Sequence, residues 1–244
     1  MGEAQLQKLS WSISALREAD SKPEFESRIA GIRDVYGFSH LTFLSVEMST
    51  LGRGYLSYST TYPEEWTSRY IERRYVRIDP VVEIYRSGFQ PVDWSSLDRA
   101  SDHTRKFFNE ALDMGIGPSG MTVPVRGSSG SRSLVSATSA VFGQEWSDLR
   151  TSTKHDLMLL SHYMHEQFQT VTGAHAQTCR DLSRREKECL QLLARGITPK
   201  RIAFALQLSE RTVRLYLGSA RRKLGAATTY QAIARASFFE LIEI

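Results

Sequence analysis

Residues 182–244 contain the start and stop signals of four short helices, and this pattern constrains the fold more than any other feature of the chain. The signals are, in chain order, Ser183 with Glu186, Gly196, Thr198 with Pro199, and Ser209. A Ser and a Glu three residues apart form a capping box at a helix start, and Gly favours the left-handed conformation that ends a helix. Thr before Pro, and a single Ser, are typical N-cap residues. We therefore expect a small module made only of helices.

The third of these helices has one apolar face and one basic face. Its apolar side chains recur at helical spacing and must face a core; they are Val213, Leu217, Ala220 and Leu224. The outward face carries Arg211, Leu215, Ser219 and Arg222, with Arg214 on the flank. A short helix, a tight turn and a second helix with a basic outer face form a helix-turn-helix, whose second helix enters the major groove. The module is therefore predicted to bind DNA.

The distribution of charge agrees with this prediction. Residues 173–244 contain 13 Lys and Arg against 6 Asp and Glu, whereas residues 1–172 contain 18 against 21. A basic minor domain joined to a mildly acidic major domain is typical of a polyanion-binding module fused to another function.

The module resembles the DNA-binding domain of the LuxR regulators. The resemblance rests on the segments REKE, IA, SERTV and KLG at their spacings, with Glu186, Leu190 and Gly196 on the most characteristic positions. It covers residues 182–242. The same domain ends response regulators and several other classes of regulator, so the first part of the chain has to decide among these classes.

The first part of the chain mixes helices and strands. We expect helices over 12–19, 23–36, 63–75, 103–114 and 147–171, a short helix that begins at Asp79-Pro80, and strands over 40–46, 54–60, 120–126 and 131–142. This mixture predicts an α+β fold, in which an antiparallel sheet lies between helices in an α/β/α layered domain. The expected domains are this layered domain at 1–171, a linker at 172–181 and a four-helix helix-turn-helix domain at 182–244.

Several function classes lack their signatures. Cys179 and Cys189 make no disulfide framework, and no apolar run reaches the roughly eighteen residues that a membrane helix needs, so we expect a soluble, cytoplasmic protein without membrane contacts. His155, His162 and His165 have no converging carboxylate or thiol, so surface or interface positions are expected rather than a metal site. Phosphate loops, zinc-protease motifs and nucleophile elbows are also missing. We expect no enzyme, no metal and no cofactor.

One set of residues in the first domain has the chemistry that a small amphipathic ligand requires. The set consists of Tyr62, Trp66, Tyr70, Asp79 and Trp94. Aromatic rings exclude water, whereas a hydroxyl, an indole N–H and a carboxylate can hold a polar head group. The alternative is that Trp66 and Tyr70 are ordinary core residues and that Asp79 only caps the helix that begins at Pro80.

These residues also reproduce, at the right spacings, the signature of the autoinducer-binding domain of LuxR-type quorum-sensing receptors. Gly120, before the strand TVPV, fits the same pattern. Both halves of the chain thus resemble one family. The resemblance implies that residues 1–171 bind an N-acyl homoserine lactone and that the chain controls quorum-sensing target genes.

The resemblance also implies a role for each residue. In that family the indole N–H at the position of Trp66 bonds the lactone carbonyl, and the carboxylate at Asp79 accepts the amide N–H of the ligand. Tyr62 binds the acyl carbonyl, Trp94 closes over the head group, and Tyr70 helps to line the pocket. A carboxylate that needs a donor should reject free acids and esters of similar shape.

One further ligand contact and three departures from the family follow from the same comparison. Ser136 matches a hydroxyl donor, and Thr138, on the same side of its strand, is the second choice. Val81 replaces a hydroxyl residue of some relatives, which removes one polar contact. Tyr216 and Gly218 depart from the recognition helix of relatives, so the operator sequence cannot be carried over.

The DNA contacts are expected mainly from the N-terminal half of the third helix. The candidates are Thr198, Lys200, Arg211, Thr212, Arg214, Leu215, Arg221 and Arg222. We expect Arg211 and Arg214 to read bases, since Arg pairs bidentately with guanine and Arg214 matches a base-reading position of the family. The expected phosphate contacts are Lys200, Arg221, Arg222 and Lys223.

The expected assembly is a homodimer on an inverted-repeat promoter site, with RNA polymerase as a further candidate partner. An apolar stripe on the helix at 147–171 can pack on its own sheet or on a second copy; it consists of Leu157, Leu160, Met164, Phe168 and Val171. A response regulator is disfavoured because the predicted strands end in Glu47 and Thr60 without an acidic pair. The competing function is a ligand-independent regulator of the same fold whose pocket is only core.

Overall fold

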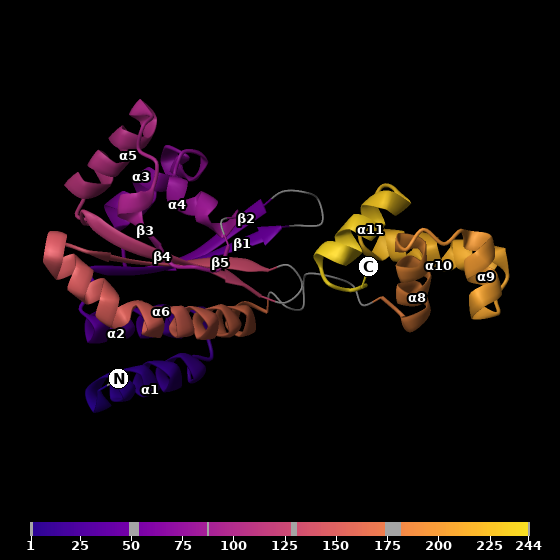
Figure 1. Cartoon of the computed structure of the whole chain (residues 1–244), viewed down its shortest axis with the longest axis horizontal. Helices are drawn as coiled ribbons and strands as arrows, with labels where there is room; N and C mark the ends of the chain where they lie inside the picture. The colour runs from indigo at the N-terminus through magenta and orange to yellow at the C-terminus, as the bar shows by residue number, and fades with distance from the viewer. Residues whose placement is uncertain (1, 49–53, 87, 128–130, 174–181, 244) are drawn as a thin grey trace. The chain divides into compact units, whose positions relative to one another are not determined.

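The computed structural model describes residues 2–48, 54–86, 88–127, 131–173 and 182–243 (Figure 1). The chain forms two compact units, of which the first contains residues 1–46, 56–127 and 132–172 and the second contains residues 173–244 together with 47–55 and 128–131. Most of the predicted linker, the turn at 128–130 and Cys179 lie outside the described residues. The domain bounds 1–171 and 182–244 therefore stay a prediction.

The first unit is built on one five-stranded sheet. Its strands are β1 (His40–Met48), β2 (Gly54–Thr60), β3 (Val92–Asp93), β4 (Ser119–Arg126) and β5 (Arg132–Ser139), in the order β2-β1-β5-β4-β3. β5 runs antiparallel to β1 and β4, and β3 runs antiparallel to β4. In the β4–β5 hairpin Thr122 lies opposite Ser136. The hairpin was expected, whereas the two-residue edge strand β3 is too short for an alternating pattern to reveal it.

Helices cover both faces of the sheet (Figure 1). On one face lie α2 (Lys22–Tyr36) and α6 (Gly143–Thr172), with α1 (Glu3–Arg17) packed against both helices. On the other face lie α3 (Glu64–Glu72), α4 (Pro80–Glu83) and α5 (Asp102–Asp113). Because both faces are covered, β4 and β5 are buried almost without interruption. The predicted α/β/α layers are confirmed.

Several helix boundaries differ from expectation, and α6, for example, begins at Gly143 instead of residue 147. α1 begins at Glu3 instead of residue 12, because Leu9 and Ile13 extend an apolar stripe that packs on the core together with the buried Leu16. α3 ends at Glu72 instead of Tyr75. Arg74 adopts a left-handed conformation with φ of 53°, and a 3-10 turn begins directly after it at Tyr75.

The apolar stripe of α6 packs on its own domain. Leu157, Leu160, Met164 and Phe168 are at most 1% exposed in one core with α2 and the sheet, and Val171 packs against that core. The stripe is therefore not available to a second copy. His165 corrects another expectation, because it is buried and its Nδ1 lies 2.7 Å from the hydroxyl of Ser133 on β5. The helical period places His165 on the sheet side, while His155 and His162 remain exposed as expected.

The second unit contains the expected helices. They are α8 (Arg184–Ala194), α9 (Pro199–Leu206), α10 (Glu210–Lys223) and α11 (Thr229–Phe238). Both hydrogen bonds of the Ser183–Glu186 capping box are present, and Ser209 caps α10. The predicted inward face of α10 is confirmed, since its four residues lie in one core with residues of α8, α9 and α11. Nowhere in the described chain is a helix both long and apolar enough to cross a membrane.

Candidate ligand-binding site and nucleic-acid interface

A mostly apolar cavity lies in the first unit between the sheet and the layer of α3, α4 and α5. The volume of this cavity is about 120 Å³. The polar residues that line it are Thr42, Tyr58, Thr60, Tyr62, Trp66, Thr67, Tyr70, Asp79, Trp94 and Ser136, and the apolar residues include Leu44, Val81, Phe107, Phe108, Ile116 and Leu134. An apolar chamber with a few convergent polar groups is the usual form of a small-molecule site.

All six predicted ligand-binding residues line this one cavity. Tyr62, Trp66, Tyr70 and Asp79 approach it from the segment around α3 and α4, Trp94 from the turn after β3, and Ser136 from β5. Thr138, the second choice for the hydroxyl donor, is not among the lining residues; it is buried, and its Oγ1 makes no hydrogen bond. The geometry thus favours Ser136 over Thr138.

The Asp79 carboxylate caps a helix and also lies in the wall of the cavity. Its Oδ1 accepts the backbone N–H of Val81 at 2.8 Å and so caps α4, as the alternative predicted. Its Oδ2 accepts the hydroxyl of Tyr70 at 2.8 Å at the cavity wall. Burial raises the pKa of Asp79 to about 6, although these two hydrogen bonds favour the ionised form. Capping α4 leaves the carboxylate with acceptor capacity toward the cavity.

An aromatic cluster forms the wall beside Asp79. The ring centroid of Trp66 lies 6.0 Å from that of Tyr70, 5.8 Å from that of Tyr75 and 5.7 Å from that of Phe107. Trp66 is only 3% exposed, and no hydrogen bond from its indole N–H is found among the described residues. Because Trp66 lines the cavity, its indole N–H is a donor that a molecule in the cavity could use.

Trp94 is held by residues that sequence reasoning missed. Its indole N–H donates to the Thr122 hydroxyl at 2.8 Å, and the Thr122 and Ser136 hydroxyls are also 2.8 Å apart. A Cβ on Gly120 would lie 2.4 Å from the Trp94 ring, so only glycine leaves room for it. The structure thus explains why glycine is needed at this position. The register of the hairpin could have identified Thr122, because Thr122 faces Ser136 on the neighbouring strand.

Hydroxyl groups from the first two strands complete the cavity. Thr42 on β1 and Thr60 on β2 line it, and their hydroxyl oxygens are 2.6 Å apart. Burial raises the pKa of the neighbouring Tyr62 hydroxyl above its ordinary value, while a hydrogen bond with Thr42 acts in the opposite direction. Tyr62 is therefore a neutral phenol that can donate one hydrogen bond. No motif in the sequence marks Thr42 or Thr60, since strand pairing alone brings them to this place.

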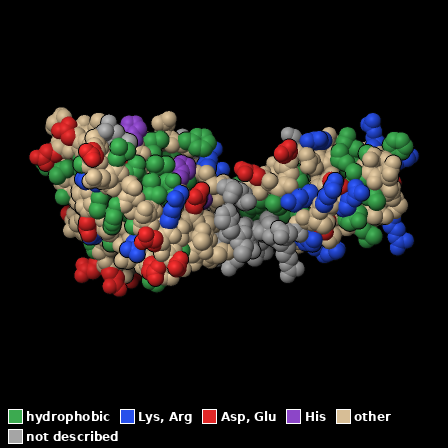
Figure 2. Space-filling model, turned by 90° about the horizontal axis from the view of Figure 1, so that it is seen from below, with side chains coloured by type: hydrophobic (Ala, Val, Ile, Leu, Met, Phe, Trp, Pro, Cys, Tyr) green, Lys and Arg blue, Asp and Glu red, His purple; other side chains and the backbone are tan. Residues whose placement is uncertain are grey.

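The second unit presents basic side chains on its surface (Figure 2). Of the predicted DNA-binding residues, those that are exposed are Thr198, Lys200, Arg211, Arg214, Leu215, Arg221 and Arg222, whereas Thr212 is half-buried. Thr198 stands at the N-cap of α9, but its side chain makes no capping hydrogen bond. The Thr212 hydroxyl lies 2.7 Å from that of Ser209. Arg214 forms an ion pair with Glu210, one turn earlier on α10.

Lys223 and Ser219 depart from their predicted positions. Lys223 Nζ lies 2.7 Å from the carboxylate of Glu186, whose side chain is 5% exposed. Burial opposes ionisation of Glu186, but hydrogen bonds from Lys223, Ser219 and Ser183 outweigh it and lower the pKa of Glu186 to about 2. Lys223 therefore joins α10 to the start of α8, and this ion pair competes with the phosphate contact expected for the residue. Ser219 also turns toward Glu186, not outward.

Comparison with known proteins places the chain in a family. Residues 21–168 match the family described as autoinducer binding domain, and residues 180–236 match the family described as bacterial regulatory proteins, luxR family. The transcriptional activator protein RaiR of Rhizobium etli is 42% identical over 174 residues, which cover 71% of this chain and 72% of RaiR.

Two solved structures of SdiA share the fold. The crystal structure of Escherichia coli SdiA has a TM-score of 0.76 at 20% identity and covers 96% of this chain and 99% of that chain. SdiA in complex with octanoyl-rac-glycerol has a TM-score of 0.74 at 21% identity and covers 94% of both chains. The chain therefore belongs to the LuxR family of bacterial transcription regulators and consists of an autoinducer-binding domain followed by a DNA-binding helix-turn-helix domain.

Proposed function

We propose that the autoinducer of this regulator is an N-acyl homoserine lactone and that its binding controls the DNA-binding domain. The observation that carries the proposal is a set of two polar groups in the lining of one mostly apolar cavity: the buried Asp79 carboxylate, and the Trp66 indole N–H, which makes no hydrogen bond among the described residues. One group needs a donor and the other an acceptor. An acyl amide attached to a lactone supplies both.

Each polar residue then has a partner on the ligand. We assign the lactone carbonyl to the Trp66 N–H, the amide N–H to Asp79 and the acyl carbonyl to the Tyr62 hydroxyl. Ser136 offers a further hydroxyl, and its bond to Thr122 orients that hydroxyl. The Trp94 N–H is already taken by Thr122, so Trp94 serves as an apolar wall over the head group and not as a donor. The acyl chain lies among the apolar side chains of β5 and α5.

The amide is the group on which discrimination depends. An ester of the same shape has no N–H for the Asp79 carboxylate, and it leaves that buried charge without its partner. A free acid brings a second negative charge to the same place, which costs more. The site should therefore prefer an acyl lactone over the matching fatty acid or methyl ester.

The test uses the complete chain, expressed with and without added acyl homoserine lactones from C4 to C16. We expect mass spectra of solvent extracts to contain the bound lactone. We also expect it to stabilise the folded protein by about 4 kcal/mol at a thousandfold excess over the dissociation constant. The matching fatty acid and methyl ester serve as controls. Empty extracts together with an unchanged melting temperature for every chain length establish the alternative, a ligand-independent regulator whose cavity is only core.

We further propose how the chain acts on DNA. Residues 182–244 bind as one half of a homodimer on an inverted-repeat promoter site in the cytoplasm, and residues 172–181 link them to the receptor domain 1–171. Arg211 and Arg214 read bases, while Thr198, Lys200, Arg221 and Arg222 meet phosphates and Thr212 and Leu215 pack along the groove. The exposure of the seven residues other than Thr212 supports this assignment. RNA polymerase is the further partner that a promoter-bound activator requires.

A further inference from the structure

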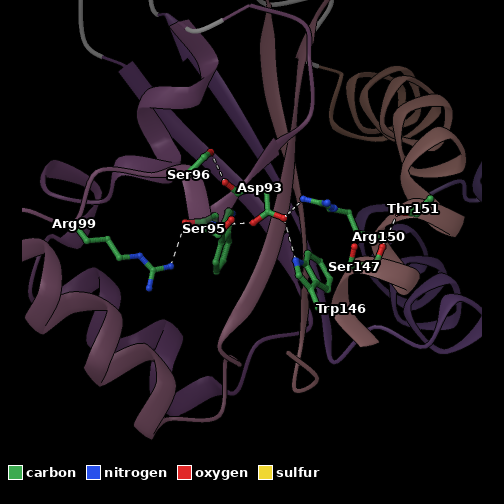
Figure 3. Close-up of polar contacts among 9 residues, drawn as sticks. Asp93, Ser95, Ser96, Arg99, Trp146, Ser147, Arg150 and Thr151 are labelled. Carbon is green, nitrogen blue, oxygen red and sulfur yellow. Dashed lines mark hydrogen bonds and ion pairs between the residues drawn. The ribbon is translucent and has the colours of Figure 1, made fainter. Parts of the chain in front are cut away.

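Asp93, the residue before Trp94, contacts helix α6 on the face of the sheet opposite the cavity. Asp93 ends the edge strand β3, and its Oδ2 accepts the Trp146 indole N–H at 3.1 Å and forms an ion pair with Arg150, both on α6 (Figure 3). Its Oδ1 accepts the backbone N–H of Ser95 at 2.8 Å. One carboxylate thus holds the turn that carries Trp94 and joins this turn to α6.

Asp93 and Trp94 point to opposite faces of the sheet. Asp93 ends β3 and Trp94 begins the 3-10 turn that follows it; the Asp93 side chain reaches α6, whereas the Trp94 side chain lines the cavity. Trp94 is also restrained at its carbonyl oxygen, which accepts a hydrogen bond from Arg99 at 3.2 Å. Together with the Thr122 bond, these contacts fix both the backbone and the ring of Trp94.

The Asp93–Arg150 pair is more protected than other ion pairs of the domain. The side chain of Asp93 is 13% exposed and that of Arg150 is 37% exposed. Burial raises the pKa of Asp93, but hydrogen bonds from Ser95, Trp146 and Arg150 outweigh it and hold the pKa below its ordinary value. Asp93 is therefore ionised at neutral pH. The pair between Arg33 and Asp34 on α2, with Asp34 67% exposed, is a suitable surface control.

We propose that Asp93, with Trp146 and Arg150 as its partners on α6, is a positioning residue that holds Trp94 in the cavity wall and so determines how tightly the pocket binds its ligand. The predicted effect on affinity rests on the proposed function, because it requires a ligand to bind against Trp94. The predicted effect on the position of Trp94 does not depend on any ligand. Asp93 touches no ligand in this scheme and acts only through Trp94.

The first measurement follows Trp94 without any ligand. The complete chain has four tryptophans, and labelling with 5-fluorotryptophan gives one ¹⁹F resonance for each, with that of Trp94 assigned from Trp94→Phe. We expect Arg150→Gln and Asp93→Asn to shift or broaden the Trp94 resonance, Arg150→Lys to restore it, and Asp34→Asn to leave it unchanged. An unmoved Trp94 resonance in a folded Arg150→Gln protein overturns the proposal, whether or not the protein binds a lactone.

The second measurement determines the dissociation constant for N-octanoyl homoserine lactone in the same variants. We expect Arg150→Gln to weaken binding about 3- to 100-fold, the range given by typical interaction energies between residues of one ion-pair network. Because Asp93 acts through the same network, adding Asp93→Asn should cause little further loss of affinity. Arg150→Lys should recover most of the affinity. Wild-type affinity in Arg150→Gln overturns the proposed effect of the Asp93–Arg150 contact on ligand binding. If the wild-type protein binds no acyl lactone, the proposed function fails, and the Trp94 resonance still decides the positioning role.

Discussion

At the scale of single residues, Asp79 is the residue for which we propose both a folding role and a ligand-binding role. Its carboxylate caps α4 and accepts the Tyr70 hydroxyl, yet burial raises its pKa to about 6. A residue selected only as a helix cap gains nothing from this burial, since an exposed cap stabilises a helix equally well. The cost of the buried charge is offset when a ligand donates a hydrogen bond to it.

Replacing Asp79 by Asn should separate the two roles. Asn keeps a cap for Val81, and its amide can donate to the Tyr70 oxygen, so we expect the free protein to lose at most about 0.5–1 kcal/mol of unfolding free energy. Binding of the acyl lactone should weaken by about 1.5–3 kcal/mol, because the variant has no charged acceptor for the amide N–H. Calorimetric titration and chemical denaturation measure the two quantities. Unchanged affinity in the folded variant contradicts the assignment of Asp79 to the amide.

The raised pKa of Asp79 also predicts how pH acts. In the unfolded chain an aspartate titrates near about 3.9, so the contribution of Asp79 to the stability of the free protein is full below that pH and is lost as pH rises through about 6. The ligand favours the ionised form, and its affinity should change in the opposite direction. We expect the dissociation constant to rise by at most about tenfold per pH unit below about 6.

The measurement for this prediction compares wild type with Asp79→Asn between pH 5 and pH 8. The variant has no charge at this position, so its affinity should depend less on pH than that of the wild type. Every other ionisable group is the same in the two proteins, so its contribution cancels in the comparison. Parallel pH profiles for the two proteins rule out Asp79 as the titrating group.

At the scale of elements, the basic residues of α10 lie in different environments. Arg214 is exposed in the N-terminal half of the helix and pairs with Glu210; Arg221 and Arg222 are exposed in the last turn; Lys223 is bound to Glu186. An exposed ion pair one turn apart contributes little to stability, so Arg214 can leave Glu210 for a base at small cost. If Lys223 moved to a phosphate, the buried Glu186 carboxylate would lose its cation and keep only hydrogen bonds from neutral groups.

Arg214→Ala and Arg222→Ala should therefore weaken DNA binding in different ways. We expect Arg214→Ala to cost about 1–3 kcal/mol on the cognate site and to reduce discrimination at one base pair of each half-site. Arg222→Ala should weaken all sequences alike and reduce the salt slope by about one unit for each phosphate that is no longer neutralised. Binding-site selection and salt titration distinguish the two effects, with Arg33→Ala in the first domain as a control. A consensus unchanged by Arg214→Ala assigns that residue to the backbone.

Lys223→Gln should affect folding and leave DNA contacts intact. Without its cation the buried Glu186 keeps only neutral hydrogen bonds, and we expect the second domain to lose about 1–3 kcal/mol of unfolding free energy. The salt slope of DNA binding should stay at the wild-type value if Lys223 remains paired with Glu186 when DNA binds. Denaturation and salt titration of one preparation test both halves. A reduced slope with wild-type stability restores the original expectation that Lys223 meets phosphate.

At the scale of the whole molecule, the proposed homodimer has to use surfaces other than the apolar stripe of α6. That stripe is consumed by the core of its own domain. We expect sedimentation of the ligand-bound chain on an inverted-repeat site to give two copies per DNA, since helix-turn-helix proteins read symmetric half-sites as dimers. Substituting the exposed Leu159 of α6 by Gln is a mild test of this helix surface. A monomer at micromolar concentration, with ligand and DNA present, counts decisively against the dimer.

The features that the sequence determined by itself are those encoded within a few consecutive residues. Caps, helical periods and the hairpin follow from local chemistry, and for this reason the helix-turn-helix module, the layered domain and five of the six cavity residues could be predicted from short spacings. Ser136 came with an alternative, Thr138, because both residues point to the same side of a strand. Only strand pairing, which brings Thr122 beside Ser136, distinguishes them.

The tertiary structure decided which groups become partners across long stretches of chain. Asp93 with Arg150, Thr42 with Thr60, and Glu186 with Lys223 lie far apart in sequence, and no local period relates them. Burial also depends on what covers a residue, so the sequence could not show that the stripe of α6 faces its own sheet. Local interactions choose the elements, whereas desolvation and hydrogen-bond pairing between elements choose the contacts.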